Sequence, residues 1–310
     1  IYALPGSVKA VNEYMSEIEK YGLEEAFWEE CNINYGYYDE DHSLLKLVYT
    51  FFVTFLKNSV SCDIPEQWKC FISSKVTNIV VLMSNIKNSM IYGTAYNELS
   101  SKIADDLSVK DLMKEMPLSD IIGCDVFDNI DRQIIAFLTE QLIHKNTNAE
   151  IGGLSIEAIC EKRRKLHFGD QYETEYKMLY NASKVMDSID YKPENSILEE
   201  LKNYADNGNY FDKVYRKFYE NYDLLKDRYP YEDLKTLIEN IYTNEFLNKV
   251  TIKWSELIAN ADDMDTLPLQ RNFYNKYVAG NKERLFVIIS DALRYEIGVG
   301  LWHKLSEDEK

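Results

Sequence analysis

The segment LLKLVYTFFVTFL, from Leu44 to Leu56, is apolar on almost every side and carries a single charge, Lys46. A helix that is apolar all round has to be covered by neighbouring elements, because no face of it is suited to water. The stretch is too short to cross a bilayer as a helix. It therefore predicts a central helix inside a bundle of helices.

The rest of the chain is predicted to be helical almost up to its end. Apolar residues recur at helical spacing, and 12 Gly and 6 Pro are few for 310 residues, which favours long helices. Further helices are predicted over residues 75–90, 94–107, 128–145, 155–166, 171–188, 196–207, 210–227, 231–250 and 268–279. Because no residue pattern repeats at a fixed period, we expect an irregular multi-helix bundle or array, with more than half of the residues helical.

Two segments have an alternative interpretation. The run Ile79–Met83 would suit a short strand, but the helical pattern on both sides favours a helix. The aromatic residues between Tyr210 and Tyr222 could stack on nucleic-acid bases. Their spacing places Phe211, Val214 and Phe218 on one stripe, which favours packing in a core.

The last part of the chain has a different pattern. Leu285–Ile289 is an apolar, β-branched run followed by Ser290 and Asp291, and a helix is predicted from Ala292. Such runs form the strands of parallel sheets that are buried on both faces. The fold class is thus mainly α, with one terminal β-strand and helix that begin a truncated α/β domain. Because residue 1 is not methionine, we expect an internal piece of a larger protein.

Three parts are predicted from these changes of pattern. The Gly152–Gly153 break separates a helical sub-domain over residues 1–150 from a second helical sub-domain over 151–283. Residues 284–310 are the first strand and helix of the truncated domain. We expect the strand either to fold back under its helix, with Trp302 and Leu305 covering it, or to pair with a second molecule as a homodimer.

Composition restricts the partners. The formal net charge of −17 repels phosphate backbones, so we expect no binding of duplex DNA by this chain. The basic run Lys162–Lys165 is predicted to be a solvated face at the end of a helix, the alternative being a patch for phosphate or an acidic partner.

Cysteine and histidine give no metal or disulfide pattern. The five cysteines are odd in number, widely spaced and without a CxxC pair, which predicts buried reduced thiols in a cytoplasmic protein. They are Cys31, Cys62, Cys70, Cys124 and Cys160. The four histidines lack the spacing of metal ligands.

Asp291 is the candidate site residue. Ligands of open α/β sheets gather at the carboxyl ends of strands, and hard cations prefer carboxylate oxygens. Asp291 is therefore a candidate metal ligand. The alternative is that Asp291 or Ser290 caps the following helix, and both roles are compatible.

The segment VIISDALRYE, Val287–Glu296, resembles the opening motif of the PglZ family of bacterial BREX phage-defence proteins, and upstream patterns resemble its type A members in the same order. The upstream matches are Lys20–Leu23, Phe27-Trp28, Asp212, Tyr215-Arg216, Phe218-Tyr219, Tyr242–Asn244, Phe246-Leu247, Trp254-Ser255, Gln270 and Phe273-Tyr274.

This resemblance implies a catalytic domain similar to alkaline phosphatases, with one or two divalent metals such as zinc, magnesium or manganese. Asp291 matches the metal ligand delivered by the first strand. The nucleophile and the other ligands would come from later strands, so we expect no bound cofactor and no activity in this chain alone. Arg294 and Glu296 match the motif too, either as groups that support Asp291 or as helix-surface residues.

Two functions follow. In the first, the chain is the helical scaffold of a metal-dependent phosphoesterase, a phosphatase or nuclease. It then docks other phage-defence proteins, with nucleic acid reached through the later domain and no membrane contact. In the second, it is a stand-alone helical protein-interaction module without a catalytic role.

Overall fold

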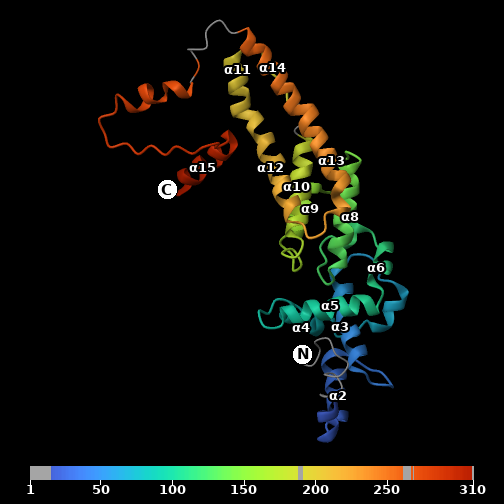
Figure 1. Ribbon diagram of the computed structural model, residues 1–310. Coiled ribbons are helices and arrows are strands. Elements are labelled where there is room, and N and C mark those ends of the chain that lie inside the picture. The colour runs from blue at the N-terminus through green and yellow to red at the C-terminus, as the bar shows by residue number, and fades with distance from the viewer. Residues whose placement is uncertain (1–14, 188–190, 261–266, 268, 309–310) are drawn as a thin grey trace. The chain divides into compact units, whose positions relative to one another are not determined.

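The computed structural model describes residues 15–187, 191–260, 267 and 269–308. Helices make up most of these residues, so the predicted mainly α fold is confirmed (Figure 1). No helix in the described ranges is both long and apolar enough to cross a membrane. The ends of two predicted helices, residues 188 and 268, lie outside the described residues.

The chain forms two compact units. The first comprises Ile1–Gln141 and Asn148–Tyr176, and the second comprises Leu142–Thr147 and Lys177–Lys310. The predicted parts 1–150, 151–283 and 284–310 divide the chain by sequence pattern, and that division stays a prediction.

The first unit is built around α3 (Leu44–Ser59), which packs against α4 (Val76–Lys87) and α5 (Gly93–Asp106). Val53 and Leu56 are fully buried in α3, which confirms the predicted central helix. Ile79 lies in α4, so the run 79–83 is helical rather than a strand. The other elements in or entering this unit are α2 (Glu24–Tyr35), η1 (Glu66–Phe71), α6 (Val109–Leu112), η2 (Met113–Glu115), α7 (Leu118–Ile121), α8 (Asn129–Ile143), α9 (Ile156–Arg163) and α10 (Glu173–Asp187).

The Gly152–Gly153 break is the turn of a small hairpin in the first unit. Strand β1 (Glu150–Ile151) pairs antiparallel with β2 (Leu154–Ser155), with Ile151 opposite Leu154. Gly152 and Gly153 have φ angles of 58° and 76°, which side chains rarely adopt. Ser155 ends the hairpin and caps α9 by accepting a hydrogen bond from the Ala158 amide.

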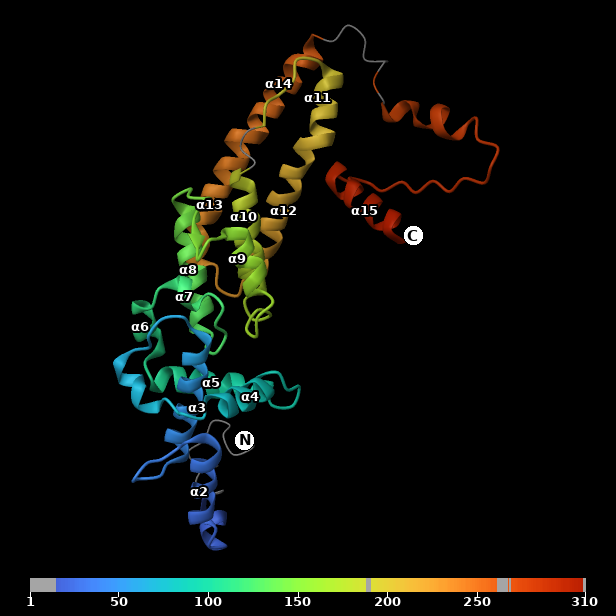
Figure 2. The same cartoon turned by 180° about the vertical axis from the view of Figure 1, so that it is seen from behind.

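The second unit contains two antiparallel helical rods, which we call the paired arm (Figures 1 and 2). One rod consists of α11 (Ile197–Asn203), the π-helical segment η3 (Tyr204–Gly208) and α12 (Asn209–Leu224). The other consists of α13 (Glu232–Asn240), the π-helical segment η5 (Ile241–Leu247) and α14 (Asn248–Ala259), after the short η4 (Tyr229–Tyr231).

Aromatic rings join the two rods of the paired arm. Phe211 stacks on Phe246 with ring centroids 4.6 Å apart, and one turn further Tyr215 stacks on Tyr242 at 3.6 Å. From one pair to the next the residue number increases on α12 and decreases on η5, as expected for antiparallel rods. Because Phe211 and Phe218 are buried, the core interpretation of this aromatic helix is confirmed.

The end of the second unit departs from the prediction. The helix predicted over 268–279 is divided into η6 (Gln270–Asn272) and the π-helical η7 (Tyr274–Val278), and α15 (Tyr295–Asp308) is the last helix. The strand predicted at Leu285–Ile289 is wrong, because these residues are extended but have no strand beside them in the described chain. A ladder needs a partner for its backbone hydrogen bonds.

Candidate functional site

Asp291 lies in a turn between the extended segment and α15. Its side chain is exposed and makes no hydrogen bond or ion pair among the described residues. Ala292 follows in the left-handed region, with a φ of 55°, so the chain turns sharply there. The carboxylate is therefore open to a ligand.

The capping role considered for Asp291 and Ser290 is wrong. The helix begins at Tyr295, and the first carbonyl to accept a helical hydrogen bond is that of Arg294, from the Gly298 amide at 3.0 Å. A capping side chain has to stand at the residue just before the first helical turn. The left-handed Ala292 delays the helix beyond the reach of Asp291.

The segment 285–289 exposes its apolar side chains. Ile288 and Ile289 are 92% and 91% exposed. Trp302 and Leu305 on α15 are 68% and 54% exposed, so the predicted cover of the strand by this helix is wrong. A single strand has no sheet face against which a helix could pack. Pairing with a second molecule stays a prediction.

A hollow lies beside this segment. It has a volume of about 760 Å³, and Val287, Ile288 and Ile289 line one part of it. Residues of η6 and η7, among them Phe273 and Tyr277, line another part. The apolar residues of this segment therefore border a hollow that η6 and η7 also line.

Glu296 is the motif residue that the structure buries. Its side chain is 4% exposed and forms an ion pair with the Nη2 atom of Arg216 on α12. The neighbouring Tyr295 ring lies 6.0 Å from that of Tyr204 in η3. Arg294, in contrast, is exposed. Glu296 thus holds α15 against the paired arm, while Arg294 is an exposed residue just before that helix.

One carboxylate of the paired arm, that of Asp212, lies among phenols. Asp212 accepts hydrogen bonds from the hydroxyls of Tyr204 and Tyr242, the latter at 2.5 Å. Burial, followed by the hydrogen bond to Asp212, raises the pKa of both phenols. The phenols therefore stay protonated and act as donors. Asp212 and Arg216, one turn apart, connect η3, η5 and α15.

Sequence patterns had marked Asp212, Arg216 and Tyr242 only as members of a resemblance. Their roles were missed because no spacing rule connects residues on different helices. The one usable signal was the separation of Asp212 and Arg216 by four positions, which places them on one helix face.

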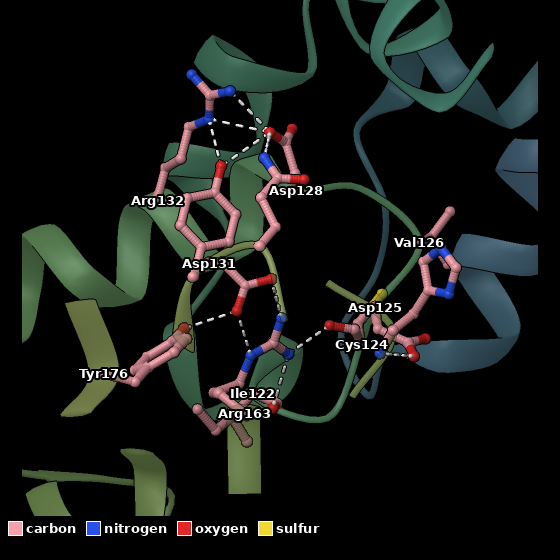
Figure 3. Close-up of polar contacts among 12 residues, drawn as sticks. Ile122, Cys124, Asp125, Val126, Asp128, Asp131, Arg132, Arg163 and Tyr176 are labelled. Carbon is pink, nitrogen blue, oxygen red and sulfur yellow. Dashed lines mark hydrogen bonds and ion pairs between the residues drawn. The ribbon is translucent and has the colours of Figure 1, made fainter. Parts of the chain in front are cut away.

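The basic run Lys162–Lys165 is solvated at Lys162 and Lys165, as predicted, but the prediction is wrong for Arg163. Arg163 is fully buried, and its Nε and Nη2 atoms donate to the two carboxylate oxygens of Asp131 at 2.8 and 2.6 Å (Figure 3). Its Nη1 atom donates to the carbonyls of Ile122 and Cys124. The hydroxyl of Tyr176 donates to Asp131 at 2.6 Å. Helix α9 turns this one residue of the run inward, where each nitrogen of its guanidinium group finds an acceptor.

Three of the five cysteines are buried as predicted. Burial raises the pKa of Cys124 and Cys160 to about 12, so their thiols are protonated and unreactive at neutral pH. The prediction is wrong for Cys70, which is exposed, and Cys62 is only partly buried.

The described residues do not form a metal site by themselves. They contain no group of three or more histidine, cysteine, aspartate or glutamate side chains that could hold an ion. Asp291 offers one free carboxylate, which is the kind of ligand that hard cations prefer.

Two curated relatives match almost the whole chain. "Alkaline phosphatase-like protein PglZ" of Bacillus cereus (strain H3081.97) is 34% identical over 98% of this chain. "Alkaline phosphatase-like protein BrxZ" of Escherichia coli O9:H4 (strain HS) is 25% identical over 94% of it. The chain spans 36% of the length of each relative. No family profile and no solved structure match it.

The chain is similar to proteins of the PglZ family over nearly all of its length. The resemblance seen at Val287–Glu296 is thereby confirmed. Within this chain the structure separates the motif into an exposed Asp291, an exposed Arg294 and a buried, ion-paired Glu296.

Proposed function

We propose that this chain is the helical scaffold of an alkaline-phosphatase-like protein that acts in bacterial phage defence. The relatives supply the term alkaline-phosphatase-like, and their match extends over nearly all of the chain. In this proposal the paired arm carries α15, and α15 follows the turn that holds Asp291. Other phage-defence proteins are the partners that the scaffold docks.

The activity proposed for the complete protein is metal-dependent hydrolysis of phosphate esters, in small molecules or in nucleic acid. A divalent ion such as zinc, magnesium or manganese would supply Lewis acidity and activate a nucleophile. The contribution of this chain is one ligand, Asp291, held at the sharp turn of Ala292. The Arg216–Glu296 pair fixes the helix behind that turn.

The observation that carries the proposal is the free carboxylate of Asp291 at the end of an unpaired apolar segment. Residues 285–289 are as exposed as a sheet strand without its neighbours would be. Burying so many aliphatic side chains is strongly favourable, so the segment suits the inside of a further α/β domain.

The test compares two aspartates in the complete natural polypeptide that contains this chain. Asp291→Asn should lower the metal content and abolish hydrolysis of bis-nitrophenyl phosphate, while Asp105→Asn, an exposed aspartate of the first unit, should change neither. Metal content is measured by mass spectrometry of the purified protein. Full metal content and full activity in Asp291→Asn would refute the proposed ligand.

The exposed face of α15 favours the second candidate function, a protein-interaction module. Ile297, Leu301 and Leu305 are exposed and follow one another at helical spacing. The chain alone should then bind a partner through α15, and Leu301→Asp should abolish that binding. If a later domain of the same protein covers α15 instead, Leu301→Asp should destabilise the complete protein and leave partner binding unchanged.

A further inference from the structure

The first unit contains an acidic hollow that the proposed chemistry does not use. Its volume is about 490 Å³, and it is lined by α2, labelled at the bottom of Figure 1, and by the loop that follows α2. Glu24, Glu25 and Glu29 line it from successive turns of the helix. None of these carboxylates has a cationic partner among the described residues.

Aromatic rings form most of the remaining wall, together with Asn32. The ring of His42 is stacked on that of Trp28 at 4.9 Å, with an angle of 8° between the planes. Tyr37 is buried with its ring 5.6 Å from Trp28, and Tyr38 is 76% exposed. Aromatic faces attract cations, and a guanidinium group can also stack on them.

Trp28 gives an independent indication of a ligand. The residue is 5% exposed and lines the hollow, and its indole Nε1 has no hydrogen-bond partner in the part of the chain that the structure describes. A buried N–H without an acceptor is costly, and native structures rarely retain one. An acceptor brought by a ligand, such as a peptide carbonyl, would satisfy it.

The charge around the hollow favours a ligand that carries positive charge. Between Met15 and His42 there are nine acidic residues and one lysine, so this short stretch carries about half of the net charge of −17. A basic partner is attracted to such a surface and an acidic one is repelled.

We propose that this hollow binds an arginine-containing segment of a partner protein. The guanidinium group lies between the carboxylates of Glu25 and Glu29 and against the aromatic wall, and a backbone carbonyl of the same segment accepts a hydrogen bond from Trp28. The inference rests on the scaffold role proposed above and does not depend on phosphoester hydrolysis. An inactive protein could therefore still bind the segment, and an active one could fail to.

The probe is a fluorescein-labelled nine-residue peptide of alternating arginine and glycine, titrated into the chain at constant salt. The triple variant Glu24→Gln/Glu25→Gln/Glu29→Gln should weaken binding about tenfold. The matched triple variant Glu17→Gln/Glu19→Gln/Glu30→Gln removes the same charge outside the hollow and should weaken it no more than about twofold. Equal losses would show diffuse attraction of a polycation and overturn the proposal.

Two further measurements test the aromatic wall. Tyr38→Ala should weaken binding about threefold, while Tyr21→Ala, an exposed tyrosine outside the hollow, should have no effect. Among the indole N–H resonances in a ¹⁵N–¹H spectrum, that of Trp28, assigned through Trp28→Phe, should move downfield on addition of the peptide. An unmoved Trp28 resonance at saturation would contradict the proposed hydrogen bond.

Discussion

Two arginine–carboxylate pairs, Arg163–Asp131 in the first unit and Arg216–Glu296 in the second, join segments that are distant in the sequence. In the first pair both side chains are fully buried, and the arginine makes four hydrogen bonds. In the second pair Glu296 is buried, but Arg216 is about one third exposed and its Nε atom has no partner in the described chain.

This difference in burial and in hydrogen bonding indicates that the two ion pairs have different structural roles. In the Arg163 cluster every nitrogen atom of the guanidinium group has a hydrogen-bond partner, so the cluster holds α8 and α9 in one arrangement. The Arg216 pair is a single contact between the paired arm and a helix with an exposed apolar face. Such a contact can open at a small cost, which suits a helix that has still to pack against something else.

The largest effect is expected from breaking the first pair. Arg163→Met leaves the Asp131 carboxylate buried without its partner and should lower the free energy of unfolding by about 3–5 kcal/mol. Urea denaturation measures it. Arg164→Met, the next residue of the same basic run, should cost less than about 1 kcal/mol because its ion pair is near the surface. Equal effects of the two variants would contradict the architectural role of Arg163.

The second pair should respond less and more locally. Glu296→Gln should lower the free energy of opening of α15 by about 1–3 kcal/mol, because it removes a charged hydrogen bond. The free energy of unfolding of the first unit should not change. Hydrogen exchange of the α15 amides is the measurement, and the exposed Arg294→Met is the control. Protection that is unchanged in Glu296→Gln would show that the pair does not hold the helix.

A pH-dependent contribution is expected in the first unit. Burial, followed by the nearby Lys87, lowers the pKa of His167 from 6.5, and the ring lies 2.6 Å from the Asn97 amide oxygen. The unfolded chain then binds more protons than the folded one below that pH. Stability should be complete above about pH 6.5 and fall as the pH drops toward the lower folded value.

Urea unfolding at several pH values checks this contribution. His167→Gln should flatten the decline in stability between about pH 7 and 5, whereas His303→Gln, at an exposed position of α15, should leave it unchanged. A decline that is as steep in His167→Gln as in the parent would assign it to other groups.

The smallest effect is expected in the extended segment. Replacing Ile288 and Ile289 by serine should change the free energy of unfolding by less than about 0.5 kcal/mol, because both side chains are exposed. Ile79→Ser, at a fully buried isoleucine, is the contrasting control. Light scattering of the same variants tests the predicted homodimer, since a dimer through this segment should dissociate in the serine variant.

Much of the fold could be predicted because helices depend on local patterns. The apolar run at 44–56 and the aromatic stripe at 211–222 specify buried helix faces within a few turns of chain. The strand at 285–289 could not be judged in the same way. Its pattern is that of a buried strand, but a strand exists only where another strand lies beside it.

The candidate site, too, could be predicted only in part from the sequence. The motif around Asp291 was visible in the sequence, as was the family that it indicates. The exposure of Arg294 and the burial of Glu296 could not be predicted from the sequence. They depend on where α15 begins and on Arg216, which forms the ion pair with Glu296.

The sequence alone determined the helical class, the central helix, the acidic charge and the resemblance to the PglZ family, since each is a property of composition or of neighbouring residues. Only the tertiary structure decided that Arg163 is buried while Arg164 is near the surface, and that Glu296 pairs with Arg216. A charge can be buried only where distant segments supply its partners, and those partners come together only when the chain is folded.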